Sequence, residues 1–292
     1  MMCVAAVAGL GLSAGAGAAD GFGAAGSAPA AHTFSVGKLQ LTALHDAQFV
    51  VANDGKTFGT GADAAATAAL LRSAGAPTDR ITLSVNALLV RTGKRVVLID
   101  TGLGPKAHGA LLASLREVGV KPSSVTDVLI THSHGDHVGG LLDADGHLAF
   151  PKATIRMSAA EWKWLQASKQ ADLVKAISKQ VHAFEPGTNL APGITAVSLP
   201  GHTPGHSGYD ISSDGVHLLC IGDLAHSYII SLAKPQWGDA FDGDGAVAKT
   251  TRSTTLKHLA DEHELVFSPH FPYPGVGTIE TAGEGFAWKP AP

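Results

Sequence analysis

Short apolar segments alternate along the chain with longer stretches whose apolar residues recur at helical spacing. Two β-branched runs, 82–90 and 95–100, flank the turn Thr92-Gly93-Lys94 and predict two successive strands. Strands that alternate with helices indicate an α/β fold in which helices cover β-sheets. The other expected strands are 34–44, 154–157, 193–199, 217–221 and 265–268, and the expected helices are 63–73, 111–118, 159–180 and 247–262.

The order strand, strand, helix, strand occurs in both halves of the chain, which suggests two similar halves in one domain. Several of the predicted strands end in a polar residue. Because strand ends gather along one edge of a sheet, these side chains can converge on a site at the seam between the halves. The residues are Asp100, His132, His202, Asp223 and His270.

The densest polar group follows the apolar run that ends at Ile130. His132 and His134 are two residues apart, so in an extended segment they point to the same side and can hold one ion. Asp136 and His137 lie beyond Gly135, where the chain turns, and would face a second point nearby. The stretch therefore suggests two neighbouring metal ions whose remaining ligands come from elsewhere. The candidates are His202, His270 and Asp223, whose carboxylate can bridge two cations.

Four separated motifs together resemble the metallo-β-lactamase superfamily over residues 36–288. They are His132-x-His134-x-Asp136-His137, Gly201-His202-Thr203-Pro204-Gly205-His206, Gly222-Asp223 and His270. The resemblance implies a four-layer αβ/βα sandwich with a dinuclear metal site at the edge between the two sheets. It assigns His132, His134 and His202 to one metal, Asp136, His137 and His270 to the other, and Asp223 to both. Asp100 would orient a ligand histidine, whereas His206 is either a supporting residue beside the ligands or a residue at a helix start.

The C-terminal third is similar to the methyl parathion hydrolase and lactonase branch of that superfamily. The similar segments are 222–226, 241–244, 270–277 and 285–288. The chain has Ile221-Gly222-Asp223 where that branch often has Trp-Gly-Asp. Members hydrolyse lactones, aryl esters or organophosphate triesters, so we expect a small hydrophobic ester or lactone as substrate. The expected pocket residues are Trp164, His226, Phe271 and Tyr273.

Two divalent cations would lower the pKa of a bridging water to roughly 7 and supply hydroxide at neutral pH. The predicted function is a metal-dependent hydrolase that opens lactones or cleaves aryl esters, with organophosphate triesterase as a side activity. Asp223 and Asp136 are the expected catalytic carboxylates, and Asp136 or His206 would protonate the leaving group. Zinc suits this ligand set, with manganese, cobalt and iron as alternatives. A β-lactamase and an iron-containing redox enzyme are the competing interpretations.

Composition excludes several other classes. Apolar residues make up 45% and charged residues 16%, which is typical of a folded globule. The formal net charge is −4, and lysine and arginine form no run, which argues against nucleic acid as a partner. Cys220 has no partner once Cys3 is removed with a leader, and it is expected to be a small buried residue. A homodimer is left open.

Residues 1–31 are expected to be a leader, and residues 32–292 the hydrolase domain. Residues 1–19 are rich in alanine and glycine and carry no charge, which resembles the apolar and cleavage parts of a secretory signal without its basic region. The segment is too short and glycine-rich for a stable membrane span, so no membrane anchor is expected. We therefore expect export to the periplasm or beyond.

Overall fold

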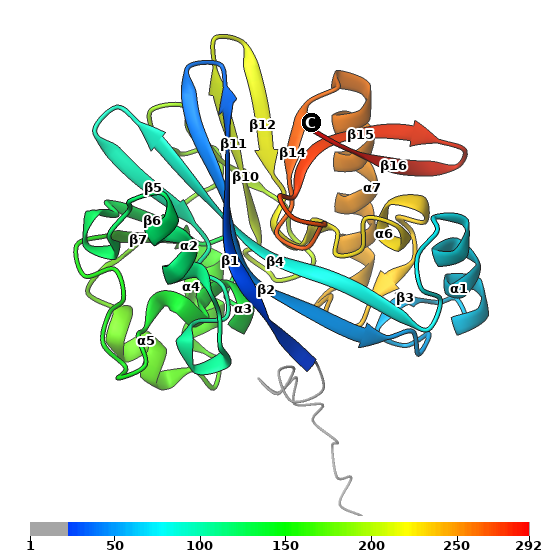
Figure 1. The fold of residues 1–292 in the computed structure, drawn as a ribbon, viewed down its shortest axis with the longest axis horizontal. Coiled ribbons are helices and arrows are strands. Elements are labelled where there is room, and N and C mark those ends of the chain that lie inside the picture. Colours follow the sequence, from blue (N-terminus) through cyan, green and yellow to red (C-terminus); the bar gives the residue numbers. More distant parts are fainter. Residues whose placement is uncertain (1–22, 292) are drawn as a thin grey trace, which may run out of the picture.

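The computed structural model describes residues 23–291, in which the strands form two seven-stranded sheets and one two-stranded sheet. The first sheet has the order β1-β2-β4-β5-β6-β7-β8, and the second has the order β16-β15-β14-β12-β11-β10-β9. Figure 1 shows the two sheets side by side, with α2, α4 and α5 on the side of the first sheet and α7 on the side of the second. The predicted α/β fold with two sheets is therefore confirmed.

The first sheet consists of β1 (Gly23–Val36), β2 (Leu39–Ala52), β4 (Arg80–Thr92), β5 (Arg95–Ile99), β6 (Asp127–Leu129), β7 (Thr154–Ser158) and β8 (Val181–Phe184). The second consists of β9 (Asn189–Ala191), β10 (Ile194–Ser198), β11 (Ser207–Ser213), β12 (Val216–Cys220), β14 (Leu265–Phe267), β15 (Val276–Ala282) and β16 (Gly285–Pro290). The small sheet pairs β3 (Phe58–Thr60) with β13 (Gly238–Asp239). The helices are α1 (Ala64–Ser73), α2 (Leu111–Glu117), α3 (Gly135–Val138), α4 (Ala159–Gln166), α5 (Ala171–Ile177), α6 (Ile230–Ala233) and α7 (Gly245–Glu262).

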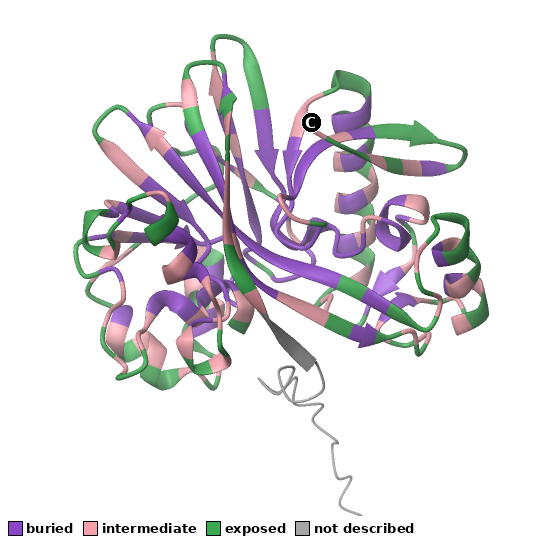
Figure 2. Cartoon of the chain, viewed as in Figure 1, coloured by how far each residue is buried: buried purple, intermediate pink, exposed green. Residues whose placement is uncertain are grey.

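Strand β4 shows why the fold has four layers. Leu88 and Val90 point into a core shared with the second sheet, whereas Ala87 and Leu89 point into a core shared with α2. Because successive residues of a strand face opposite sides, a strand buried on both faces is apolar at every position. A third core, which includes Leu256, lies between the second sheet and α7. Figure 2 shows the buried residues along the middle of the strands.

Residues 23–31, which were expected to belong to the leader, lie in β1, and this strand begins at Gly23 and pairs antiparallel with β2. Main-chain hydrogen bonds hold this strand, and they do not require large side chains, so an Ala/Gly-rich segment can join a sheet. The predicted signal sequence, residues 1–19, lies outside the described residues. Among the residues described, no helix is long and apolar enough to cross a membrane.

The helix expected over 159–180 is two helices, α4 and α5, separated at residues 167–170. At this break Gln170 donates from Nε2 to the carbonyl of Ser133 at 3.0 Å, and its backbone N–H donates to Ser168 Oγ at 3.1 Å. Side-chain hydrogen bonds to a distant loop thus interrupt a stretch whose composition favours one continuous helix.

Candidate metal centre

The seven candidate ligands all follow strands at one edge of the two sheets. His132 and His134 lie in the loop after β6, Asp136 and His137 lie in α3, and His202 follows β10. Asp223 follows β12, and His270 follows β14. Strands β12 and β14 are parallel. Strand β10 runs in the same direction as β12, because both are antiparallel to β11, which lies between them. The strand ends therefore bring together residues that are up to 138 positions apart, from His132 to His270.

Three imidazoles and one carboxylate form the first group. His134 Nδ1 lies 3.0 Å from His132 Nε2 and 2.8 Å from His202 Nε2. Asp223 Oδ2 lies 3.5 Å from His132 Nε2 and 3.4 Å from His202 Nε2. These four side chains could hold one ion.

Asp136, His137 and His270 form the second group, which shares Asp223 with the first. Asp223 Oδ1 lies 3.2 Å from both His137 Nε2 and His270 Nε2. Asp136 Oδ2 lies 3.6 Å from His137 Nε2 and 3.5 Å from His270 Nε2. Asp223 thus lies between the two groups: Oδ2 is near His132 and His202, Oδ1 is near His137, and His270 Nε2 is close to both oxygens, at 3.2 Å from Oδ1 and 3.3 Å from Oδ2.

The protonation pattern fits cations at this position. His137 donates from Nδ1 to Asp100 Oδ2 at 2.9 Å, and His202 donates from Nδ1 to Asp242 Oδ1 at 3.2 Å. His270 donates from Nδ1 to the carbonyl of Ser84 at 2.8 Å. Carboxylates and carbonyls only accept, so each neutral ring presents the lone pair of Nε2 to the centre. His137 Nε2 and Asp223 Oδ1 are buried and have no hydrogen-bond partner among the described residues, and such an acceptor-only cavity fits divalent metal ions.

Burial dominates the electrostatics of the first group. It lowers the pKa of His132 and of His202 well below the usual range, which favours the neutral form that binds metal. Burial also opposes charge on His137, but Asp223, Asp136 and Asp100 outweigh it and raise the pKa of His137 well above normal. The three carboxylates thus favour positive charge in the second group, which a bound cation would also supply.

Asp100 contacts a ligand histidine, as the resemblance implied. Its Oδ2 accepts from Thr131 Oγ1 at 2.8 Å in addition to His137 Nδ1, and its Oδ1 accepts from the Thr131 backbone N–H at 2.8 Å. Its backbone φ of 60° is in the left-handed region, which a non-glycine residue seldom adopts. These contacts fix the orientation of the His137 ring.

His206 supports Asp223 through the backbone. Its Nδ1 donates to the Leu199 carbonyl at 2.7 Å, and its Nε2 accepts from the Asp223 N–H at 2.9 Å. Burial lowers the pKa of His206 to about 4, so the ring is neutral at pH 7. Gly222 has a φ of 49°, and a Cβ there would lie 2.5 Å from His206 Nε2, so this position requires glycine. Both ring nitrogens are occupied, which leaves Asp136 as the candidate proton donor.

The structure separates the four predicted pocket residues. The Trp164 ring lies 5.7 Å from that of His134, centroid to centroid, and His226 Nε2 lies 3.1 Å from Asp223 Oδ2. Phe271 is fully buried in the core beside α7, with its ring 4.9 Å from that of Trp288, so its assignment to the pocket is wrong. The chain bends at residues 269–272, and within this bend His270 faces the centre whereas Phe271 faces the core.

Tyr273 is partly buried. Its ring centroid is 5.2 Å from that of His45, and the side chain packs on the core between the sheets. Its place in the pocket stays a prediction. Two aromatic residues that the sequence interpretation did not select lie beside the centre. The rings of Phe58 and Phe241 lie 5.6 Å and 6.1 Å from that of His226.

Glu161 is a further residue that motif reasoning missed. Its Oε1 accepts from the backbone N–H of Ser133 at 2.8 Å and from Ser133 Oγ at 2.7 Å, while Oε2 accepts from Thr203 Oγ1 at 2.6 Å. Ser133 lies between two ligands, and Thr203 follows a third, so this carboxylate links two ligand loops. The available signal was Ser158-x-x-Glu161, a capping-box pattern; Ser158 Oγ does accept from the Glu161 N–H at 3.1 Å.

We expect Glu161→Gln to lower the free energy of unfolding of the metal-free protein by about 2 kcal/mol, because three charge-assisted hydrogen bonds become neutral ones and an amide nitrogen in place of Oε2 cannot accept from Thr203 Oγ1. Chemical denaturation monitored by circular dichroism measures the change. Glu185→Gln is the matched control: Glu185 is exposed, and a change within about 0.5 kcal/mol is expected. Equal stability of the two variants would contradict the linking role.

Curated relatives match the chain over about half of its length. Metallo-beta-lactamase domain-containing protein 1 of Xenopus laevis is 33% identical over 154 residues, which cover 52% of this chain and 53% of that protein. An N-acyl homoserine lactonase of Bacillus cereus is 27% identical over 171 residues, which cover 50% of this chain and 66% of that protein. The match thus spans about half the length of the first of these relatives.

Solved structures extend the similarity to nearly the whole chain. AidC, a dizinc quorum-quenching lactonase, has 29% identity and a TM-score of 0.84 over 90% of this chain and 98% of its own. AbOPH, a hydrolase in the beta lactamase superfamily, has 27% identity and a TM-score of 0.82 over 91% of this chain and 98% of its own. Residues 80–270 match the Metallo-beta-lactamase superfamily as a family. The chain therefore belongs to the metallo-beta-lactamase superfamily and has its fold.

Proposed function

We propose that the protein is a dinuclear metal-dependent hydrolase that opens lactones and cleaves aryl esters. The observation that carries the proposal is the position of Asp223, whose carboxylate lies between two groups of candidate ligands and contacts both. Similarity to a dizinc lactonase supports the lactone part of the proposal. Organophosphate triesters are proposed as a side activity, supported by the branch resemblance of the C-terminal third.

His132, His134 and His202 would hold one ion, Asp136, His137 and His270 the other, and Asp223 both. Zinc is the proposed metal, because imidazole and carboxylate ligands suit it. When bound, two such ions supply Lewis acidity and an activated water at neutral pH.

The chain itself positions the reactants and handles the proton. His134 and Asp136 are the two partly exposed ligands, whereas the other five are buried. The substrate therefore approaches from the side of His134 and Asp136, and the Trp164 ring beside His134 offers it an apolar wall. The Asp136 side chain is 18% exposed and can hand a proton to the departing oxygen.

A panel of substrates on one purified preparation tests the proposal. It comprises a δ-lactone, an N-acyl homoserine lactone, an aryl ester, methyl paraoxon and nitrocefin, with metal content measured on the same sample. We expect turnover of a lactone and the aryl ester, weaker turnover of methyl paraoxon, and none of nitrocefin. Turnover of nitrocefin alone would favour a β-lactamase, and an iron-containing protein that reduces oxygen would favour a redox enzyme.

A further inference from the structure

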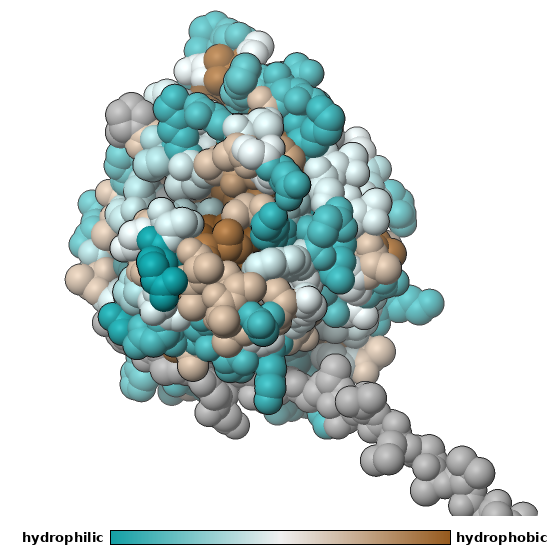
Figure 3. Space-filling model, turned by 90° about the vertical axis from the view of Figure 1, so that its right-hand side faces the viewer, coloured by the Kyte–Doolittle hydropathy of each residue, from teal (hydrophilic) through white to brown (hydrophobic). Residues whose placement is uncertain are grey.

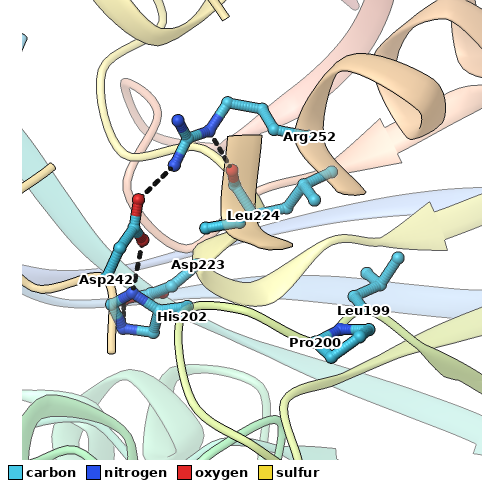
Figure 4. A pocket seen from close by; sticks show the side chains of 8 residues that line it. Leu199, Pro200, His202, Asp223, Leu224, Asp242 and Arg252 are labelled. Atoms are coloured by element: carbon cyan, nitrogen blue, oxygen red, sulfur yellow. Dashed lines mark hydrogen bonds and ion pairs between the residues drawn. The ribbon is translucent and has the colours of Figure 1, made fainter. Parts of the chain in front are cut away.

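One buried guanidinium lies behind the candidate metal centre. Arg252 is in the middle of α7, where its residue is 1% exposed, although most of that buried helix face is apolar. Its Nε donates to the Leu224 carbonyl at 2.7 Å, and its Nη1 donates to the Trp237 carbonyl at 2.9 Å. Its Nη2 donates to Asp242 Oδ2 at 2.9 Å and lies 3.5 Å from Asp239 Oδ2. Figure 4 shows the link from Arg252 through Asp242 to His202.

Each of the two carboxylates continues to an imidazole at the centre. Asp242 Oδ1 accepts from His202 Nδ1 at 3.2 Å, and Asp239 Oδ2 accepts from His226 Nδ1 at 2.9 Å. The far nitrogens of both rings face the same oxygen, Asp223 Oδ2, at 3.4 Å for His202 and 3.1 Å for His226. One guanidinium thus reaches the shared carboxylate by two parallel routes.

The cost of burying these charges indicates that the arrangement does more than fill space. A buried ion pair is often no more stabilising than apolar residues of the same volume. Neighbouring positions on the same helix face are occupied by Ala248, Leu256 and Leu259, so an apolar side chain at residue 252 would continue the pattern. Burial raises the pKa of Asp242, but the hydrogen bond from His202 and the charge of Arg252 outweigh this and lower it to about 2. Asp242 thus accepts from His202 with one oxygen and from Arg252 with the other.

We propose that Arg252 is a positioning residue for metal binding: by holding Asp242 and Asp239, it fixes the ring orientation and tautomer of His202 and His226 on the Oδ2 side of Asp223. The inference rests on metal binding by the cluster and not on which ester is hydrolysed. Of these two rings, only His202 belongs to a predicted ligand group. Loss of the contacts from Arg252 should therefore weaken the binding of one metal ion and leave the binding of the other unchanged.

Zinc affinity measured by competition with a chromophoric chelator tests this on the full-length protein. For Asp242→Asn and Arg252→Gln we expect one of the two zinc ions to bind about 10–100-fold more weakly, with the other unchanged. Arg252→Lys keeps the charge but not the planar fork, so an intermediate loss is expected. Replacing zinc by Co²⁺ gives a second readout, and its absorption spectrum should change in Asp242→Asn but not in Lys257→Gln.

Lys257→Gln provides the control on the same helix, because the Lys257 side chain is 69% exposed and pairs with Asp261. Zinc affinity unchanged in Asp242→Asn would overturn the proposal, as would equal weakening of both sites. If Arg252→Gln does not fold, Arg252→Lys and Asp242→Asn decide the matter, and parent-like zinc binding in Arg252→Lys would overturn it. A parent protein that binds two zinc ions but opens no lactone would refute the proposed substrate and leave this inference standing.

Discussion

Replacing Asp223 by alanine is expected to lower kcat/KM for the best lactone or aryl ester by at least about a thousand-fold, equivalent to about 4 kcal/mol of transition-state stabilisation. The carboxylate lies within 3.5 Å of five imidazole nitrogens, those of His132, His137, His202, His226 and His270. Its removal takes a ligand from both proposed metal positions at once. We therefore expect the zinc content to fall together with the activity.

The measurement compares kcat/KM and bound zinc per chain in the variant and the parent. Asp210→Ala is the matched control, because Asp210 lies on the neighbouring strand β11 and its side chain pairs with that of His217. That variant should retain full activity and zinc. An Asp223→Ala protein that keeps both ions and full activity would refute a bridging role for this carboxylate.

Metal removal is expected to abolish hydrolysis and to lower the melting temperature. An ion present at about 1,000 times its dissociation constant stabilises the folded state by about 4 kcal/mol per site. Without cations, the lone pairs of the imidazole rings and the carboxylates of the cluster face one another in a buried space. The folded state also loses the free energy of metal binding. Thermal unfolding and activity before and after dialysis against a chelator provide the test.

Addition of zinc to the stripped protein should restore both properties, and parallel additions of manganese, cobalt and iron would identify the preferred metal. A chelator already saturated with zinc is the control for effects of the chelator itself. Undiminished activity in protein with less than about one tenth of an ion per chain would exclude the metal-dependent mechanism.

Residues outside the sequence motifs hold the loops that carry the candidate ligands. Glu161 fixes the loops after β6 and β10 to each other, and Arg252 holds the carboxylates behind His202 and His226. The face that carries α1 and α6 is mostly hydrophilic, with apolar residues near its centre (Figure 3). Glu161 and Arg252, the charged residues that make these supporting contacts, are buried and do not form part of that face.

The sequence alone determined the family, the two-sheet fold and the candidate ligands. Strands could be predicted because a segment buried on both faces is a nearly continuous apolar run, as in residues 87–90 of β4. The ligands could be predicted because His132 to His137 are neighbours in the chain and the others directly follow apolar runs. The structure brings all seven together, and their role in binding metal stays a prediction that the Asp223 and chelation experiments address.

Tertiary structure alone decided the direction of side chains and the partners of buried charges. Phe271 follows a candidate ligand but points into the core, because the chain bends at residues 269–272 and no regular side-chain alternation applies there. Glu161 contacts Thr203, and Arg252 contacts Leu224, across 42 and 28 residues, and no local spacing encodes such contacts. The start of β1 at Gly23 depended on main-chain pairing with β2, which alanine and glycine support without leaving a hydrophobic pattern.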